Sequence, residues 1–311
     1  MIENAEPVIL LAGPTASGKT ALAVRLAKAL NGEIINADSM QIYADLNILS
    51  ARPDEKEQGG IPHHLFGTMD GAERASVGWW AETVLNLITE IQERGRRPII
   101  VGGTGLYFNA LVKGLAAMPE ISARTRQSVE DIASQGLEAL REQAMACDPV
   151  ATERIKPADR QRLMRVVEIG LETGQPITKF QADTTPLLAE ADWTGLVIEL
   201  ERPSLYERIE QRFDAMMTNG ALEEVKALAS RQLNRNLPAM KALGVPPLLA
   251  VIAEEVEMEV AILQSKQDTR RYAKRQMTWF RNQMPDWHRV TCQDGEISDE
   301  DLIGRLQPLT E

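Results

Sequence analysis

Short apolar runs alternate with longer segments of helical periodicity in the first hundred residues. Residues 8–12 (VILLA) form a continuous apolar run that stops at Gly13 and Pro14, which is typical of a buried strand entering a turn. Residues 20–30 then carry apolar side chains at helical spacing. We expect a C-cap near Asn31 and Gly32. The following segments predict a strand at 33–36, a helix at 76–94 and a strand at 98–101.

Strands that alternate with helices predict an α/β fold with a parallel sheet covered on both faces. Ligands of such sheets bind beyond the carboxyl ends of the strands. Each of the three expected strands is followed by a chemically distinctive segment at that end: 13–20, 37–39 and 102–105. We therefore expect one cleft at this edge of the sheet.

The pattern changes near Met118. Residues 121–188 contain helical segments and no convincing strand, so we interpret 119–191 as a helical insertion domain. Residues 196–200 (LVIEL) indicate a return to the sheet. The core domain would then comprise 1–118 and 192–311. Its second part is expected to be mainly helical from 204 to about 284, with a loop around 244–247.

Composition narrows the class of protein. The chain has 311 residues, 44% hydrophobic and 25% charged, which is ordinary for a globular protein. Neither a secretory signal nor a membrane span is expected, because the start lacks basic residues and no apolar stretch is long enough. Cys147 and Cys292 lack metal-ligand spacing. We expect a cytoplasmic protein with reduced thiols and no membrane contact.

The net charge of −11 argues at first against a nucleic-acid partner. Phosphate contacts depend on local potential, however, and two segments gather basic residues. They are Arg160, Arg162 and Arg165, and Arg270, Arg271, Lys274, Arg275 and Arg281. Charge alone leaves open whether these clusters are solvated helix faces or phosphate contacts.

One motif carries specific chemistry. Its residues fit the pattern G-x-x-x-x-G-K-[ST], between an expected strand and an expected helix, as a phosphate-binding P-loop requires: Gly13, Pro14, Thr15, Ala16, Ser17, Gly18, Lys19 and Thr20. Backbone amides and the helix N-terminus would hold phosphate oxygens. Lys19 would add a full positive charge, Ser17 a hydroxyl donor, and Thr20 a ligand for Mg²⁺.

The motif does not identify the phosphorylated ligand. ATP and GTP hydrolases usually carry a second strand that ends in a metal-holding carboxylate. Here the strand at 98–101 ends in Gly102, Gly103 and Thr104, and no guanine-reading N-K-x-D tetrad is present. This favours a bound diphosphate over a transferable γ-phosphate.

Two further polar residues should reach the same cleft. Asp38, at the end of the second strand, is a candidate metal ligand, general base or strand-end cap. Thr104, in the turn after the third strand, is either a site residue or a turn residue that bonds its own backbone.

Together these segments resemble the tRNA dimethylallyltransferase family, also called tRNA isopentenyltransferases. The resemblance extends in order from about Val8 to Arg281. It rests on GPTASGKT at 13–20, DSMQIY at 38–43, PHHL at 62–65, GGTGLY at 102–107, DRQRLMRVVEI at 159–169 and TRRYAKRQMTWFR at 269–281.

The resemblance implies transfer of a dimethylallyl group from dimethylallyl diphosphate to N6 of the adenosine immediately 3′ of the anticodon. It implies a P-loop NTPase-like core, Mg²⁺, a monomeric enzyme and the anticodon stem-loop of tRNA as partner. Asp38 would take the amine proton, Thr104 would help to hold the amine, and Lys19 and Arg126 would stabilise the leaving diphosphate. The tRNA contacts would be Asp38, Ser39, Met40, Gln41, Gln161, Arg162, Leu163, Met164 and Arg165, with Lys274, Arg275 and Arg281 as candidate phosphate contacts.

The chain departs from the family pattern at three places. Ala44 replaces a common arginine, residues 49–53 read LSARP instead of GTAKP, and Val245 follows Gly244 in place of tyrosine. Three other functions remain as alternatives: prenylation of free adenine nucleotides, a small-molecule P-loop kinase, and an RNA-binding protein without catalysis. The long insertion and the C-terminal basic residues favour a macromolecular acceptor over a free nucleotide.

Overall fold

Six parallel strands form one sheet in the computed structural model, which describes residues 6–116, 118–181, 184–291 and 304. The order across the sheet is β3-β2-β4-β1-β5-β6. The strands are β1 (Val8–Ala12), β2 (Gly32–Asn36), β3 (His63–His64), β4 (Arg97–Gly102), β5 (Trp193–Glu199) and β6 (His288–Thr291). Strand β1 lies between β4 and β5, with Leu11 opposite Val101 on one side and Leu196 on the other.

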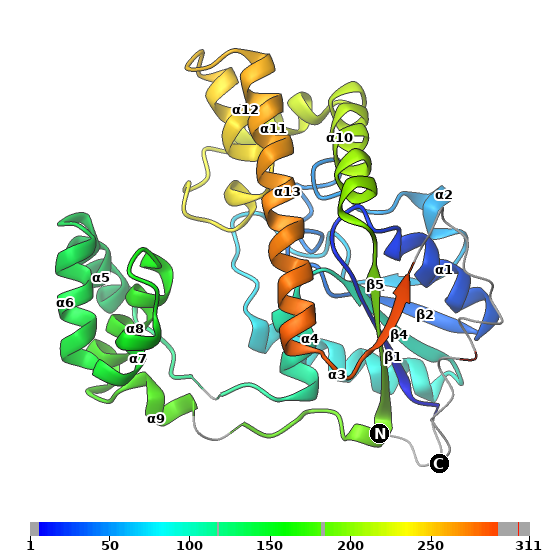
Figure 1. Ribbon diagram of the computed structural model, residues 1–311, viewed down its shortest axis with the longest axis horizontal. Coiled ribbons are helices and arrows are strands. Elements are labelled where there is room, and N and C mark those ends of the chain that lie inside the picture. The colour runs from blue at the N-terminus through cyan, green and yellow to red at the C-terminus, as the bar shows by residue number, and fades with distance from the viewer. Residues whose placement is uncertain (1–5, 117, 182–183, 292–303, 305–311) are drawn as a thin grey trace. The chain divides into compact units, whose positions relative to one another are not determined.

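Helices cover both faces of this sheet (Figure 1). The helices outside residues 113–187 are α1 (Lys19–Ala29), α2 (Glu55–Gln58), α3 (Val77–Glu93), α4 (Gly105–Val112), α10 (Arg202–Thr218), α11 (Ala221–Ser230), α12 (Val245–Ile252) and α13 (Met258–Gln283). Of these, α1, α3 and α4 pack on the strands, whereas α11 and α12 pack against α10 and α13. Burial on both sides explains why every residue of β1, β2 and β4 is buried and why these strands do not alternate in polarity. The expected α/β fold with a helix-flanked parallel sheet is confirmed.

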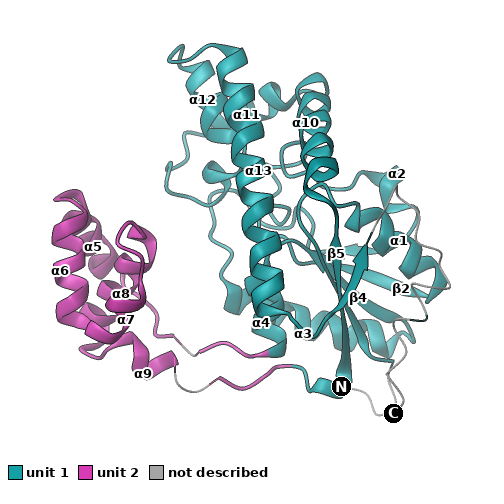
Figure 2. Cartoon of the chain, in the orientation of Figure 1, with its two compact units in different colours: residues 1–112, 188–311 teal, residues 113–187 magenta. Residues whose placement is uncertain are grey.

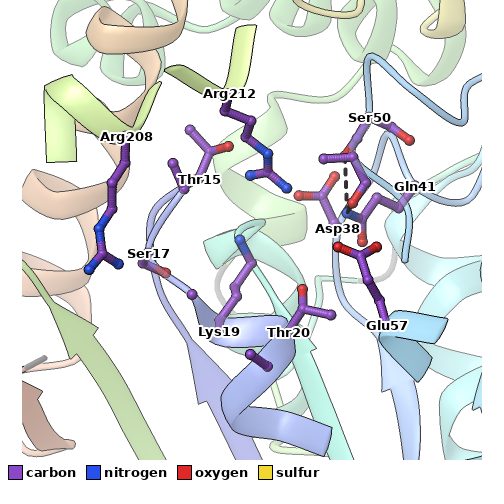
Figure 3. A pocket seen from close by; sticks show the side chains of 14 residues that line it. Thr15, Ser17, Lys19, Thr20, Asp38, Gln41, Ser50, Glu57, Arg208 and Arg212 are labelled. Atoms are coloured by element: carbon purple, nitrogen blue, oxygen red, sulfur yellow. Dashed lines mark hydrogen bonds between the residues drawn. The ribbon is translucent and has the colours of Figure 1, made fainter. Parts of the chain in front are cut away.

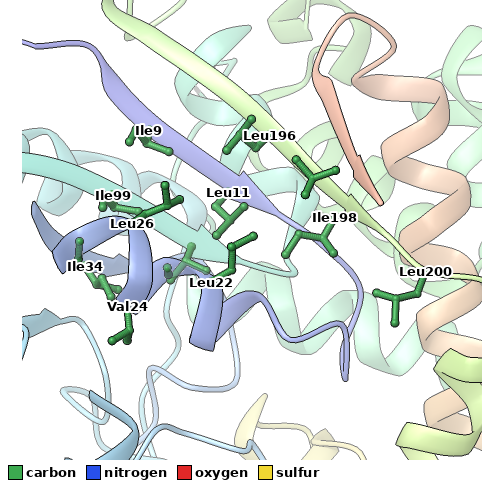
Figure 4. Close-up of a cluster of buried hydrophobic side chains, with 14 of the residues drawn as sticks. Ile9, Leu11, Leu22, Val24, Leu26, Ile34, Ile99, Leu196, Ile198 and Leu200 are labelled. Atoms are coloured by element: carbon green, nitrogen blue, oxygen red, sulfur yellow. The ribbon is translucent and has the colours of Figure 1, made fainter. Parts of the chain in front are cut away.

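The main core holds in place α1 and α10, the two helices that contribute residues to the site described below. Every second strand residue, including Ile9, Leu11 and Ile198, points to the face where α1 packs (Figure 4). Leu205 and Ile209 of α10 belong to the same buried cluster. The start of α1 and the middle of α10 are therefore held near the same end of β1.

Residues 113–187 form a second compact unit of helices (Figure 2). It contains α5 (Ala123–Ser134), α6 (Leu137–Cys147), α7 (Pro149–Arg154), α8 (Arg160–Thr173) and α9 (Ile177–Gln181). Its core is its own, built around residues such as Val129, Leu140 and Leu163. Asp148 caps α7 through Oδ1 and accepts two hydrogen bonds from Thr178 through Oδ2, which ties α9 to this core.

The structure corrects the sequence analysis at four places: one loop, one helix cap and two strands. The loop expected around 244–247 is wrong: Gly244, with φ 88°, precedes α12, and the prolines at 246 and 247 lie in its first turn, where their missing N–H groups cost nothing. Gly32 opens β2 instead of capping α1. The strands β3 and β6 were not anticipated, because two and four residues carry too little periodicity. Cys292 lies outside the described residues.

No helix among the described residues is both long and apolar enough to cross a membrane.

Candidate active site

The P-loop follows β1 directly and turns into α1. Gly18, with φ 85°, is the N-cap of that helix, and Ala16 also has a positive φ of 61°. The Ser17 side chain is only 1% exposed, and among the groups that the structure describes none bonds its Oγ. A buried hydroxyl without a partner is costly unless a ligand completes it. Ser17 therefore indicates a place for an anion inside the loop.

Lys19 lies within the P-loop and points into the pocket, toward Asp38 and Arg212 (Figure 3). Its Nζ donates a hydrogen bond to the carbonyl of Pro14, at 3.3 Å. Burial lowers the pKa of Lys19 to about 8; Asp38 opposes this shift and Arg212 adds to it. The amine is therefore a poorly solvated cation, which favours binding of a multivalent anion.

Asp38 is held opposite Lys19 by the buried side chain of Asn36. The Asn36 Oδ1 accepts the N–H of Asp38 at 2.8 Å, and its Nδ2 donates to the carbonyl of Asp38 at 2.9 Å and to that of Leu65 at 3.0 Å. The carboxylate is then oriented by the N–H of Met40, which donates to Oδ1 at 3.0 Å. Asp38 is thus fixed at the strand end through both its backbone and its side chain.

Thr104 lies on the neighbouring turn, after β4. Its Oγ1 accepts the N–H of Ser39 at 3.0 Å and donates to the Ser39 Oγ at 3.3 Å. It also shares a hydrogen bond with the hydroxyl of Tyr272, whose pKa burial raises. A substrate amine would therefore have to replace one of these bonds.

The pocket between the P-loop and Asp38 has a volume of about 290 Å³, and Thr104 is not among the residues that line it (Figure 3). Residues 15–21 of the P-loop and first helical turn form one wall, and Asp38, Gln41 and Glu57 form another. Arg208 and Arg212 of α10 complete it. All of the lining residues belong to the first compact unit.

Arg208, Arg212 and Glu57 were missed by the sequence analysis. The two arginines are four residues apart, so they share a helical face, which was a usable signal. What the sequence does not reveal is that α10 packs beside the P-loop. Burial lowers the pKa of Arg212, while Glu57 and Asp38 raise it. Both arginines add positive charge to the place where a diphosphate would lie.

The expected RNA contacts near the pocket differ in how accessible they are. Ser39 and Met40 are half-buried. Gln41 is only 8% exposed, and its amide donates to the carbonyls of Ser50 and Ala51 at 3.0 and 2.9 Å. The Nε2 of Gln41 is therefore used within the protein.

On α8 the expected RNA contacts divide between two faces. Gln161 and Arg162 are exposed, whereas Leu163 is 0% exposed in the core of the second unit. The Leu163 side chain is therefore part of this core, and the role of this position as an RNA contact stays a prediction. Met164 packs partly against the same core, and Arg165 is paired with Glu168 at 3.1 Å.

The other basic candidates are exposed. Lys274, Arg275 and Arg281 lie on the outside of α13, with the Arg275 guanidinium 5.6 Å from the centre of the Tyr272 ring. Arg126 lies in the first turn of α5, in the second unit, and its side chain is exposed. Its role near the leaving diphosphate stays a prediction.

Two family models match the chain. The model described as IPP transferase covers residues 41–283, and the model described as isopentenyl transferase covers residues 6–64. A tRNA dimethylallyltransferase of Maricaulis maris is 54% identical over 294 residues, or 94% of this chain and 95% of the relative. That of Phenylobacterium zucineum is 49% identical and covers 98% of this chain and 99% of the relative.

Solved structures agree with the sequence relatives. A tRNA isopentenylpyrophosphate transferase from Bacillus halodurans, 34% identical, superposes with a TM-score of 0.71 over 97% of both chains. A eukaryotic dimethylallyltransferase captured acting on tRNA, 27% identical, has a TM-score of 0.78 over 93% of this chain and 75% of the other. These matches confirm the resemblance drawn from the motifs: the chain belongs to the tRNA dimethylallyltransferase family and is a tRNA-modifying transferase.

Proposed function

We propose that this chain transfers the dimethylallyl group of dimethylallyl diphosphate to N6 of the adenosine immediately 3′ of the anticodon. The observation that carries the proposal is the shared pocket, where the P-loop with Lys19 faces Asp38. One wall suits a diphosphate and the other supplies a base. Since a single unit of one chain forms the whole pocket, we propose a monomer as the active form.

The diphosphate would lie over the P-loop. The Ser17 hydroxyl, the amides at the start of α1 and the Lys19 ammonium would bind its oxygens. Arg208 and Arg212 approach from α10. Because this charge is in place before the C–O bond breaks, it stabilises the departing diphosphate without reorganisation, usually a large catalytic effect.

Mg²⁺ is the metal that this pocket fits. The Thr20 hydroxyl lines the pocket one residue after Lys19, in the position from which P-loop proteins bind the ion. Mg²⁺ at phosphate sites takes one or two protein oxygens and completes its shell with phosphate oxygens and water. When bound there, it would neutralise part of the diphosphate charge.

The acceptor amine needs a base because its lone pair is delocalised into the adenine ring. As N6 forms its bond to C1 of the prenyl group, the C1–O bond breaks and diphosphate leaves with the electron pair. The amine proton passes to the Asp38 carboxylate, which the Met40 N–H holds in position. Thr104 lies beside it, on the turn that Ser39 bonds, and would help to hold the amine.

The tRNA would be held by the exposed basic residues of both units. We propose Arg162 and Arg165 on α8, and Lys274, Arg275 and Arg281 on α13, as phosphate contacts. We propose further that Arg126 reaches the diphosphate when tRNA is bound. Because tRNA is the acceptor, we propose that the enzyme acts in the cytoplasm.

The test is a product assay with three acceptors. The purified chain is incubated with dimethylallyl diphosphate, Mg²⁺ and unmodified tRNA, AMP or adenosine, and the products are analysed by mass spectrometry. We expect prenylated adenosine in the tRNA at the position after the anticodon and none in AMP. Prenylated AMP would support the free-nucleotide alternative. In a parallel incubation with labelled ATP in place of dimethylallyl diphosphate, transfer of the γ-phosphate to adenosine would support the kinase instead.

A further inference from the structure

Gln276 of α13 links two loops that are far apart in sequence. Its Oε1 accepts the N–H of Thr15 at 2.9 Å, and its Nε2 donates to the carbonyl of Gly103 at 2.8 Å. The side chain is only 5% exposed. Both ends of one buried amide are therefore used, one on the P-loop and one on the turn after β4.

Glycines at 103 and 105 let helix α13 approach this turn closely. A methyl group at Gly103 would lie 2.3 Å from the Gln276 Nε2, so the glycine leaves room for the amide where it is found. A methyl group at Gly105 would lie 2.2 Å from the Trp279 ring. Tyr272, one turn earlier, bonds Thr104. Three positions on one face of α13 thus contact residues 103–105.

These two loops carry the two reacting partners of the proposed function. The P-loop holds the leaving diphosphate, and residue 104 lies next to the amine that attacks. Transfer between them depends on their separation, and a misplacement of about 1 Å can cost roughly 10²-fold in rate. Among the described residues, the Gln276 side chain bonds both loops, next to the backbone hydrogen bond from the Gly13 N–H to the Gly102 carbonyl at 3.3 Å.

We propose that Gln276 is a positioning residue for the transfer, setting the distance between the diphosphate and the adenine amine. The proposal rests on the proposed function. It also gives the N–H of Thr15 a structural role, because this amide donates its hydrogen bond to Gln276. An amide side chain is required at position 276 because it both donates and accepts at neutral charge.

The test compares Gln276→Met, Gln276→Glu and the control Gln264→Met. Methionine keeps the length and loses both bonds, whereas glutamate keeps the acceptor for Thr15 and turns a carboxylate oxygen toward the Gly103 carbonyl. Gln264 lies on the same helix but is exposed, and its amide donates to Asp268 on the next turn at 2.8 Å. Single-turnover transfer to tRNA, pyrophosphate affinity by calorimetry and thermal unfolding are measured for each.

We expect Gln276→Met to lower the single-turnover rate by about 10–100-fold. Its affinity for pyrophosphate should change by less than about threefold, because Lys19 and the helix amides are untouched. Gln264→Met should match the wild type in every measurement. A wild-type transfer rate in Gln276→Met would overturn the proposal.

The pH profile of Gln276→Glu separates positioning from a general loss of stability. A protonated glutamic acid can again donate to Gly103, and burial raises the pKa of such a group. The rate of Gln276→Glu relative to wild type should therefore rise as the pH falls, while that of Gln276→Met should not. A flat ratio would contradict the proposal even if Gln276→Met failed to fold. A wild type that prenylates no tRNA would instead refute the proposed function.

Discussion

Asp38 shows how a single side chain can be placed by a residue with no chemical role of its own. Asn36 is 0% exposed, and its side chain accepts a hydrogen bond from the N–H of Asp38 and donates one to the carbonyl of Asp38. The sequence revealed the strand end and the carboxylate. It could not reveal that the Asn36 side chain bonds the backbone of Asp38, because an asparagine at a strand end is equally typical of an ordinary turn.

Lys19 predicts a pH dependence of diphosphate binding, because its pKa of about 8 lies close to neutral pH. The charged form binds diphosphate, so affinity should be full below pH 8. It should fall as the pH rises through 8, by roughly tenfold per pH unit. Calorimetric titration with pyrophosphate between pH 7 and 9.5 measures this slope.

The control for that prediction is Lys19→Ala, which should bind pyrophosphate more weakly at every pH. Pyrophosphate titrates in this range too, but equally for both proteins, so the difference between them isolates Lys19. If the two proteins showed the same pH slope, Lys19 would not be the titrating group.

Helix α8 places neighbouring residues of one sequence motif on different faces. Five consecutive positions, 161–165, were predicted to contact RNA because they match one family segment. The helix turns them toward different surroundings, and Leu163 faces the core with Val167 while Arg162 faces outward. A linear motif therefore overstates a contact surface, since 3.6 residues per turn divide it between two faces.

This division predicts opposite effects for neighbouring substitutions. Leu163→Ala should destabilise the second unit by about 2–5 kcal/mol, because it removes a fully buried side chain. Arg162→Ala combined with Arg165→Ala should leave thermal unfolding nearly unchanged, weaken tRNA binding and reduce its salt dependence by about one to two units of slope.

Thermal unfolding and tRNA affinity from 50 to 200 mM salt check both predictions. An unaltered salt slope in the double variant would assign the α8 arginines to a solvated face, where Arg162 and Arg165 already pair with Asp159 and Glu168. A stable Leu163→Ala would place that side chain outside the core.

Elements remote in sequence explain most of what the sequence analysis missed in the pocket. The P-loop and the ends of β2 and β4 were predictable, because each motif directly follows its own strand. Arg212 and Gln276 were not, since their helices lie about 200 residues or more beyond the P-loop and reach it only through packing of the core. Such contacts leave no local pattern.

At the scale of the whole molecule, the charge of the pocket differs in sign from the net charge of the chain. The chain carries a net charge of −11, yet its pocket collects Lys19, Arg208 and Arg212 against Asp38 and Glu57. Focused positive potential inside an acidic protein attracts a small anion without making the whole surface adhere to nucleic acid. The fold creates this focus by bringing α1 and α10 to the same strand end.

The central claim is that Asp38 removes the proton while the P-loop holds the leaving group. It is tested most directly by the single-turnover rate of tRNA prenylation for Asp38→Asn, with saturating dimethylallyl diphosphate, tRNA and Mg²⁺. Asparagine keeps the shape and the oxygen that bonds Met40, so binding of tRNA and of pyrophosphate should be retained. We predict a rate about 10²–10⁴-fold below wild type. A rate close to that of wild type would contradict the claim.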